Sequence, residues 1–322
     1  MAKQNRNKVD HTARLNDQFR VALQEIVDAV EGGDNDGFEL PFQAGGRPYN
    51  PATGHAATGT NALICLLLGV NYYSTYDGWQ KLGYQVPRGQ EATLYLARPR
   101  KFKIDADKSP TGEDEWRVGG FDSVAVWSYD VVVPRVAEEE AEMKRKPRHP
   151  MPAKPWTPPA LKEVSEVETI ERAEAFIANL GAKVSHTTEG RAFYRPSDDS
   201  ITMPVREMFS ATKTRSATQA YYSVSLHEHA HWTGHKSRCD RLGDKSRRGY
   251  AHEELTAEIS ALILCADLGI TATIRPDHIK YIASWLKALD DDKRYIFSAG
   301  KLAQDAVEYM HSLQPENQAE AA

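Results

Sequence analysis

The chain contains little cysteine and no long apolar segment. Its three cysteines, Cys65, Cys239 and Cys265, are widely spaced in 322 residues, so they provide neither a disulfide framework nor a C-x-x-C motif. No run of roughly 18 apolar residues is present, which argues against a membrane-spanning helix and a membrane partner. The first six residues are polar and lack the apolar segment of a signal peptide. We therefore expect a cytoplasmic protein.

An excess of positive charge is also lacking. The sequence has 40 Lys and Arg against 45 Asp and Glu, which gives a net charge of −5. Proteins that bind nucleic acid usually carry a visible basic footprint. Any nucleic-acid binding by this chain must therefore come from a local patch. The length and the ordinary hydrophobic content of 41% fit two globular domains, each with its own core.

The most informative feature that is present is the pentapeptide His227-Glu228-His229-Ala230-His231. It matches H-E-x-x-H, the signature of zinc metallopeptidases. On a helix, residues four apart project from one face, so His227 and His231 can reach one metal ion. Glu228 is turned by about 100° from His227. It can therefore stand beside the ion and hold a water molecule without being a ligand.

Helix start and stop signals surround this motif. Ser216 and Gln219 form a capping box, and Gly234 occupies the position of a C-terminal cap. The residues between them include no helix breaker. The pattern predicts a helix that carries both histidines on one face. A histidine-rich helix without metal remains the alternative.

A catalytic zinc site needs a third protein ligand. His235 lies four residues beyond His231, but Gly234 is expected to end the helix before it. Three ligands on consecutive turns would also lie in a row instead of surrounding an ion. The metzincin pattern requires a histidine at position 237, where this chain has Ser237.

A better third ligand lies on a second helix, which is predicted from about residue 250 to Gly269. On this helix Glu254 and Glu258 are four residues apart, and a ligand followed by such an acid is the gluzincin arrangement. The second acid can accept a hydrogen bond from a ligand histidine. We assign Glu254 as ligand and Glu258 as its supporting acid. Glu253 has Ala257 at the equivalent position and fits a solvated helix start, a reading that also stays open for Glu254.

Changes in composition divide the chain into three parts. An N-terminal region ends at residue 136, a linker rich in charge and proline covers residues 137–163, and a C-terminal domain covers residues 164–322. The first region is predicted to hold a helix at residues 15–30, a glycine-rich loop at 45–61 and a second helix at 62–70. Two strands follow at residues 92–97 and 123–128, joined by a long hairpin excursion at 98–122. In the second domain we expect three short strands near residues 183–204, followed by the two metal-site helices and two final helices.

Several further segments of the sequence, in both halves of the chain, resemble one known protein family. Residues 46–54, 59–63, 75–79 and 83–89 resemble the N-terminal domain of the ArdC antirestriction family. In the second half, four segments resemble the zincin-like C-terminal domain of that family: residues 193–204, 226–235, 250–258 and 282–286. The resemblance covers nearly the whole chain in the family's domain order. It implies an α+β protein with an N-terminal α+β DNA-binding domain and a C-terminal zincin-like, gluzincin-type metallopeptidase domain.

The resemblance further implies a protein of conjugative plasmids that protects incoming DNA from host restriction and binds single-stranded DNA. Double-stranded DNA is left open as a further partner, and the protein substrate of the peptidase is not specified. Stacking on bases needs exposed aromatic side chains, and following phosphates needs Lys or Arg. The residues that meet these needs, or that lie in the resembling loops, are Arg47, Tyr49, Asn50, Asn61, Trp79, Lys81, Arg88, Lys101 and Lys103.

The expected reaction is that of a zinc metalloendopeptidase. With Zn²⁺ held by the two histidines and Glu254, Glu228 acts as general base; another divalent metal such as Mn²⁺ is also compatible. A hydrogen bond to the developing oxyanion can come from Tyr250, His252 or His235. Two alternatives stand beside this reading. The protein could shield DNA with a structural or silent zinc site, or it could be a peptidase whose N-terminal domain recognises protein.

Overall fold

The chain folds into two units, and each unit is made of three separate segments of the sequence. The computed structural model describes residues 10–31, 38–39, 46–105, 110, 114–137, 147–159, 166–211, 215–244, 246–271, 273–274 and 279–315. The first unit comprises Met1–Val21, Asn50–Gly54 and Tyr72–Thr157; the second comprises Ala22–Tyr49, His55–Asn71 and Pro158–Ala322. The boundaries fall inside helix α1 (His11–Glu31) and strand β2 (Tyr49–Asn50). The fold is α+β, as predicted.

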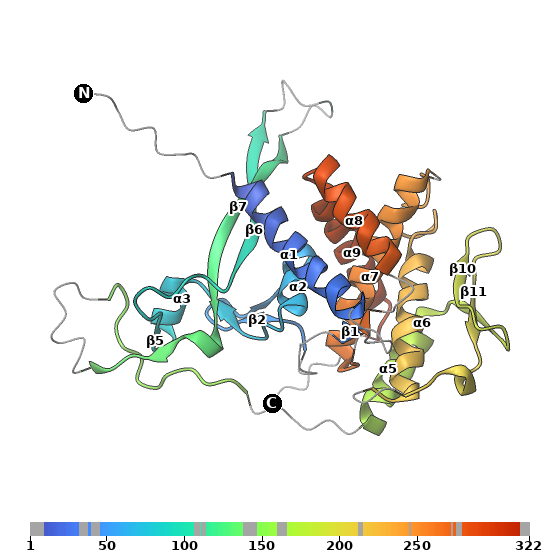
Figure 1. Ribbon diagram of the computed structural model, residues 1–322, viewed down its shortest axis with the longest axis horizontal. Helices are drawn as coiled ribbons and strands as arrows, with labels where there is room; N and C mark the ends of the chain where they lie inside the picture. The colour runs from blue at the N-terminus through green and yellow to red at the C-terminus, as the bar shows by residue number, and fades with distance from the viewer. Residues whose placement is uncertain are drawn as a thin grey trace. The chain divides into compact units, whose positions relative to one another are not determined.

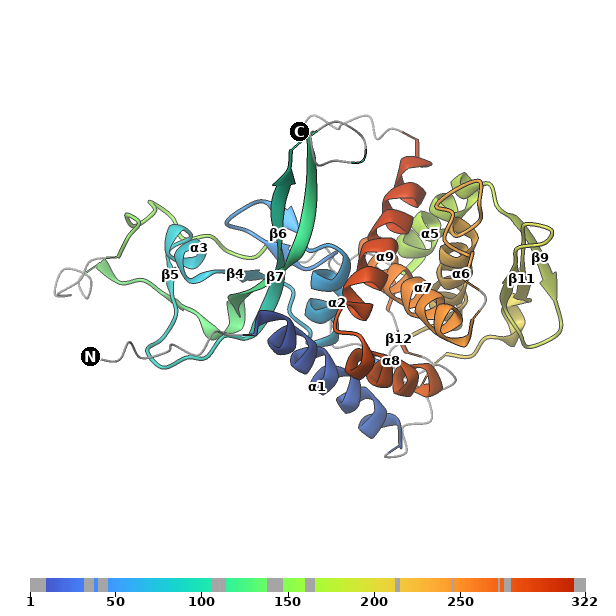
Figure 2. The same cartoon turned by 90° about the horizontal axis from the view of Figure 1, so that it is seen from above.

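The first unit is built around a twisted antiparallel ribbon. Strands β6 (Leu94–Ile104) and β7 (Glu115–Ser128) pair along most of their length, and the short strand β4 (Tyr73–Ser74) extends the sheet in the order β4-β7-β6. Both views show β6 and β7 side by side (Figures 1 and 2). The sequence predicts a long hairpin excursion at residues 98–122, and the antiparallel pairing of β6 with β7 confirms the hairpin. The strands themselves are longer than predicted, since β6 extends to Ile104 and β7 begins at Glu115.

The core of this unit is mainly aromatic. Helix α3 (Tyr76–Lys81) places Trp79 at the centre, with 0% of its surface exposed, and the indole N–H donates to the Trp127 carbonyl oxygen at 2.8 Å. Strands β5 (Tyr84–Gln85) and β8 (Val133–Pro134) pair antiparallel beside it, and the turn η1 (Tyr129–Val131) precedes β8. Tyr84 and Trp156 lie within 6.3 Å of the Trp79 ring, measured between ring centroids.

Part of the predicted linker packs on the first unit. The guanidinium of Arg135, which is 6% exposed, donates to the carbonyl oxygens of Gln80 at 2.6 Å and His149 at 3.0 Å. Further along, the Trp156 N–H donates to the Leu82 carbonyl oxygen at 2.9 Å. The charged run at residues 138–146 lies outside the described residues. The first unit thus continues to Thr157, while the predicted domain limits stay a prediction.

The second unit consists of helices that pack beside a small mixed sheet. The sheet has the order β10-β11-β9, in which β10 (Phe193–Arg195) pairs antiparallel and β9 (Lys183–Thr187) parallel with β11 (Ser200–Pro204). The turn η2 (Arg206–Met208) follows β11, and β1 (Phe38–Glu39) pairs with β12 (Thr273–Ile274). The remaining short strand, β3, is His55–Ala56. The three strands predicted near residues 183–204 are confirmed.

Besides the end of α1, the described part of the second unit contains six helices: α2 (Gly59–Leu67), α5 (Glu166–Leu180), α6 (Ala217–Thr233), α7 (Arg247–Leu268), α8 (Ile279–Asp291) and α9 (Tyr295–Ser312). Helix α7 packs against α6 and against α9. Fully buried residues from each helix form the core, among them Leu226, Ile263 and Val307. Within the described residues, no helix is long and apolar enough to cross a membrane.

Two glycines allow α2 to approach α9 closely. Gly59 has a φ of +50°, and a Cβ added there would lie 2.7 Å from the Gly300 carbonyl oxygen. A Cβ added at Gly300 would lie 2.7 Å from the Thr60 backbone nitrogen. The Gly59 N–H also donates to the Gln304 side-chain oxygen at 3.0 Å. Backbone therefore meets backbone at this crossing, and a side chain at either position has no room.

Replacing Gly300 with alanine should reduce the stability of the protein. The new methyl group would overlap the start of α2, and overpacking of this kind costs about 2 kcal/mol. Chemical denaturation of the full chain, followed by circular dichroism, measures this free energy of unfolding. Gly243→Ala is the matched control, because a Cβ at Gly243 meets no atom within 4 Å. Equal stabilities of the two variants would contradict the close crossing.

Candidate metal centre

The two histidines are presented by a helix whose ends agree with the sequence. Helix α6 begins after Ser216, whose side-chain oxygen accepts from the Gln219 N–H at 3.1 Å. It ends at Gly234, as predicted. Helix α7 is capped by Ser246 and ends at Gly269, which has the left-handed conformation expected of a C-terminal cap. Each of the two helices thus has a cap at both of its ends.

Side chains from α6 and α7 converge at one point. The Nε2 atoms of His227 and His231 each lie 3.7 Å from a different carboxylate oxygen of Glu254. One donor atom from each residue falls within 4.8 Å of the others. All three side chains are at most 13% exposed. Two imidazole nitrogens and one carboxylate facing a common point are a donor set that fits a divalent transition metal.

The other ring nitrogens are held by two further carboxylates. Glu258 lies 3.1 Å from His227 Nδ1, in the place that the sequence predicted for a supporting acid. Glu253 lies 3.0 Å from His231 Nδ1. Each contact orients the ring so that Nε2 faces Glu254. The sequence analysis treated Glu253 as a solvated residue at a helix start, and the structure corrects this, because its side chain is 13% exposed and directed at His231.

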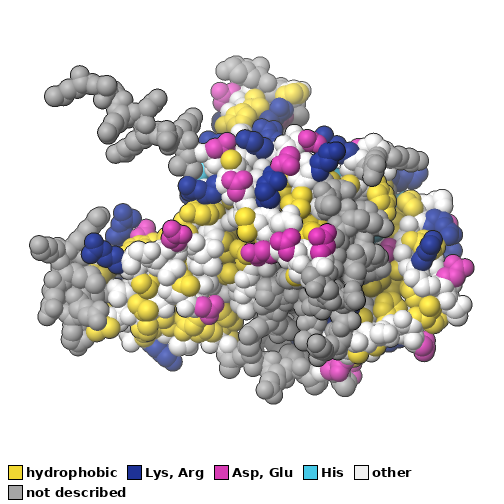
Figure 3. Space-filling model, viewed as in Figure 1, with side chains coloured by type: hydrophobic (Ala, Val, Ile, Leu, Met, Phe, Trp, Pro, Cys, Tyr) yellow, Lys and Arg dark blue, Asp and Glu magenta, His cyan; other side chains and the backbone are white. Residues whose placement is uncertain are grey.

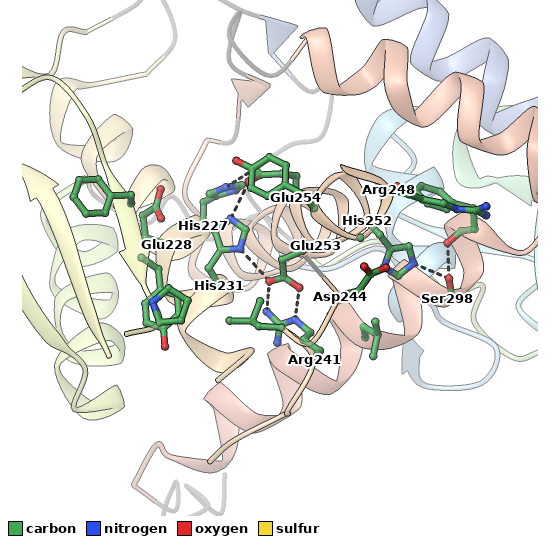
Figure 4. Close-up of a pocket in the computed structure, with 18 of the residues that line it drawn as sticks. His227, Glu228, His231, Arg241, Asp244, Arg248, His252, Glu253, Glu254 and Ser298 are labelled. Carbon is green, nitrogen blue, oxygen red and sulfur yellow. Dashed lines mark hydrogen bonds and ion pairs between the residues drawn. The ribbon is translucent and has the colours of Figure 1, made fainter. Parts of the chain in front are cut away.

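Arg241 connects Glu253 to the end of α6. Its side chain is 3% exposed, and it donates from Nε and Nη2 to the two oxygens of Glu253 at 2.8 and 3.0 Å. It also donates to the Thr233 hydroxyl at 2.6 Å and to the Ala230 carbonyl oxygen. Figure 4 shows Glu253 between Arg241 and His231. Sequence reasoning missed this arginine, since nothing in the spacing of residues 231–253 indicates that the loop returns to the site.

The electrostatics of the site couple the imidazoles to their carboxylates. Burial alone lowers the pKa of His227, but the hydrogen bonds that its imidazole donates to Glu254 and Glu258 outweigh burial and raise the pKa to about 10. Burial is likewise outweighed at His231, whose pKa rises to about 9 beside Glu253 and Glu254. Burial would raise the pKa of Glu254, but the two histidines lower it well below its usual range. A cation at this point therefore competes with protons for the same nitrogens.

The third histidine of the motif has a different environment. His229 is fully buried, and its Nδ1 donates to the Ser225 carbonyl oxygen at 2.7 Å. Burial lowers the pKa of this imidazole to about 4, although the contact with Ser225 acts in the opposite direction. His229 is therefore a neutral core residue. Its side chain lies on a different face of α6 from His227 and His231, which face Glu254.

The convergent residues open into a cavity of about 710 Å³. Glu228 lines it and is 5% exposed, and in Figure 4 its carboxylate lies beside His227. Tyr250 also lines the cavity and is 53% exposed. Two other residues are candidates for the oxyanion contact. His252 lines the cavity, and its Nε2 lies 2.7 Å from the Ser298 hydroxyl. His235 does not line the cavity. Tyr250 and His252 therefore both line the cavity, and the assignment of Tyr250 to the oxyanion contact stays a prediction.

The residues predicted to contact DNA do not form one group. Arg47, Tyr49 and Asn61 belong to the second unit, and Arg47 lies 2.5 Å from Asp267 in a largely buried ion pair. Tyr49 is half-buried in β2, and Asn61 is half-buried in the first turn of α2. These positions explain the three residues as parts of the fold.

The remaining predicted contacts lie in the first unit and differ among themselves. The fully buried ring of Trp79 cannot stack on a base in this structure, so that assignment is corrected. Asn50 accepts from the Ala52 N–H and the Ser74 hydroxyl, both at 3.0 Å, and so shapes a turn. Four of the predicted cations are exposed, namely Lys81, Arg88, Lys101 and Lys103.

Two family models match the chain in succession. One, described as the N-terminal domain of anti-restriction factor ArdC, matches residues 16–147, and the other, described as a zincin-like metallopeptidase, matches residues 171–302. The chain belongs to the ArdC antirestriction family. Its C-terminal domain is accordingly zincin-like, as predicted.

Solved structures of this family cover nearly the whole chain. The metal-free crystal structure of antirestriction protein ArdC from plasmid R388 is 28% identical, has a TM-score of 0.61, and aligns over 92% of this chain and 97% of that one. The Mn(II)-bound structure is 27% identical, with a TM-score of 0.60 and coverage of 93% and 99%.

Two curated relatives match the chain along most of its length. The uncharacterized protein y4eC of Sinorhizobium fredii (strain NBRC 101917 / NGR234) is 33% identical over 94% of each chain. DNA primase TraC of Escherichia coli is 31% identical over 90% of this chain, but the match spans 19% of TraC. The chain therefore corresponds to a small part of that larger protein.

In this ArdC-family chain, Glu253→Gln should weaken metal binding. Losing the charge that holds His231 Nδ1 is expected to lower the affinity for Zn²⁺ or Mn²⁺ about 10- to 100-fold. Isothermal titration of metal-free protein measures this affinity. Glu174→Gln is a matched control, because Glu174 accepts from Tyr222 of α6 at 2.6 Å and from Arg206 at 2.7 Å without touching the histidines. Equal affinities for the two variants would show that Glu253 does not support the site.

Proposed function

We propose that this chain is an antirestriction protein that binds single-stranded DNA and carries a zinc-dependent endopeptidase site in its second unit. The observation that carries the enzymatic half is the convergence of two imidazole Nε2 atoms and one carboxylate on a point inside a cavity that Glu228 also lines. A purely structural zinc site is normally closed by four protein ligands. Three donors beside a large cavity instead favour a site that accepts a substrate.

His227, His231 and Glu254 would hold the metal. Two nitrogens and one oxygen suit Zn²⁺, and the Mn(II)-bound ArdC structure indicates that a relative accommodates a different divalent ion. When bound, such an ion polarises a carbonyl group and lowers the pKa of a water molecule. Glu253 and Glu258 would keep both imidazoles in the tautomer that leaves Nε2 available.

The other cavity residues have roles in proton transfer and binding. Glu228 would accept the proton of the attacking water and pass it to the leaving amine. The Tyr250 hydroxyl would donate a hydrogen bond to the oxyanion that develops on the substrate carbonyl. Strand β10 is at the edge of its sheet, and residues Phe193 and Tyr194 line the cavity. An extended peptide could therefore pair with this edge and present its backbone to Glu228.

The DNA-binding half is supported by the match to the ArdC N-terminal domain and by exposed cations in the first unit. Since the net charge of the chain is −5, any contact with phosphates must be local. A protein that holds single-stranded DNA with one unit can act on proteins bound to the same DNA with the other. Shielding of DNA alone, with a silent metal site, is the alternative that the experiments below separate from this function.

Glu228→Gln should abolish proteolysis and leave metal content unchanged. The amide keeps the size of the side chain but cannot take a proton, so turnover of an unstructured protein such as casein should fall at least about 100-fold. Metal content is measured by mass spectrometry of the purified protein. Glu207→Gln, at an exposed position on η2, serves as control. Antirestriction in cells that survives Glu228→Gln would show that shielding, not proteolysis, provides protection.

Binding of single-stranded DNA by the full chain should weaken as salt rises. For three phosphate contacts, raising the salt from 50 to 200 mM is expected to lower the affinity about 20-fold. Fluorescence anisotropy with a labelled oligothymidylate measures the affinity, and a duplex of equal length tests the preference for single strands. Absence of binding, or an affinity independent of salt, would contradict the DNA-binding half of the proposal.

A further inference from the structure

The outer part of the β6–β7 ribbon is exposed on both faces. We call residues 98–104 of β6 and 115–120 of β7 the distal ribbon. Every side chain from residue 98 to 103 and from 116 to 119 is exposed, whereas Leu94, Leu96 and Val126 at the base of the ribbon are buried. A two-stranded ribbon in water gains little from packing, so its side chains would be expected to be polar.

The distal ribbon instead carries large apolar side chains. Trp116 is 67% exposed, which is the highest value among the large hydrophobic residues that the structure describes. Phe102 and Val118 are 48% and 49% exposed. In Figure 3, hydrophobic and basic side chains lie next to each other on the ribbon, which projects near the top of the view. Exposed aromatic groups of this size indicate a surface that another molecule covers.

The register places each aromatic ring beside a cation. Trp116 is opposite Lys103, and Val118 is opposite Lys101; residues two apart on a strand share a face, so these four form one face. Phe102 is opposite Arg117 on the other face. Both faces therefore combine a flat apolar surface with positive charge.

Two glycines of β7 make room for side chains of β6. A Cβ added to Gly119 would lie 3.1 Å from the Phe102 ring, and one added to Gly120 would lie 2.8 Å from Arg100 Nη2. Gly120 also has a φ of +150°, which disfavours other residues. The glycines thus occur where the strand must leave room for Phe102 and Arg100.

The charges of the distal ribbon suit an anionic partner. It carries five cations, namely Arg98, Arg100, Lys101, Lys103 and Arg117. Asp122 lies 3.1 Å from Arg98 and 3.5 Å from Arg100, and Asp114 lies 2.6 Å from Lys103. Glu115 also lies 3.0 Å from Arg117. The cations of these pairs are 45% to 68% exposed, although Asp122 and Glu115 are partly buried, so the cations can exchange their partners for phosphates at little cost. Lys101 forms no ion pair with any residue that the structure describes.

We propose that the distal ribbon is the surface on which single-stranded DNA binds, with bases stacked on Trp116 and Phe102 and phosphates beside Lys101, Lys103 and Arg117. This inference rests on the proposed DNA-binding function and names its site. Stacking on flat rings flanked by cations is how proteins hold single strands without reading sequence. Bases in a duplex are already stacked on each other and do not offer their faces to Trp116.

The experiment uses the full chain and a fluorescein-labelled oligothymidylate. Trp116→Ala and Phe102→Ala are each expected to lower the affinity about tenfold, and Trp116→Phe, which keeps an aromatic face, to lower it less than about threefold. Met208→Ala is the control, because Met208 is 45% exposed but lies on η2 in the second unit. It should bind as the wild type does.

A second measurement follows the ring itself. Stacking of thymine should quench the fluorescence of Trp116, so the quenching seen with wild-type protein should be smaller in Trp116→Phe. If wild-type protein binds the oligonucleotide and the Trp116→Ala/Phe102→Ala double variant binds equally well, the distal ribbon is not the site, although DNA binding stands. If the alanine variants lose duplex binding to the same degree, the ribbon is a general DNA contact and the stacking proposal is overturned. If wild-type protein binds no single strand, both proposals fail.

Discussion

The packing of α6 against α7 brings two imidazoles and three carboxylates into one buried layer. None of these groups could be buried alone without a large desolvation cost, so each depends on the others and on the angle at which the helices meet. Glu254 lies between the two Nε2 atoms, while Glu253 and Glu258 hold the two Nδ1 atoms. Arg241 completes the layer by neutralising Glu253 and binding the last turn of α6. The zincin-like site is therefore as much a structural core as a place for chemistry.

Much of this layer could be predicted from local sequence. The H-E-x-x-H spacing puts His227 and His231 on one helix face, and the Ser216 cap and the Gly234 stop delimit that helix, as the structure confirms. The spacing of Glu254 and Glu258 on the next helix supplied two of the carboxylates. The partner of His231 could not be found in this way. Glu253 reaches it only because of how α7 crosses α6, and Arg241 arrives from an irregular loop whose path no periodicity describes.

The fold shows the same division between local and long-range information. Helix limits and the three strands of the second unit follow from capping residues, glycines and the alternation of apolar and polar residues. Local sequence does not tell which helices or strands pack against each other. Helix α2, close to the N-terminus in sequence, packs on α9, and Arg47 pairs with Asp267 in the same unit. Composition cannot decide whether a loop rich in glycine and proline contacts nucleic acid, because it does not fix exposure, and Arg47 of this loop pairs with Asp267. Trp79 was misjudged for the converse reason, since an aromatic ring near a turn can equally well fill a core.

The contact between Gly59 and Gln304 has a consequence for synthesis of the protein. The two residues are separated by 245 positions, so α2 leaves the ribosome long before its partner α9 exists. Until α7 and α9 have been made, the apolar run from Ala62 to Leu67 lacks the helices that pack against it, and such exposed segments promote aggregation during folding. Helix α7 also packs against α9, so the metal-site layer has its full surroundings only after residues 295–312 have been synthesised. The layer that brings His227, His231 and Glu254 together thus completes its packing only after all three residues have been synthesised.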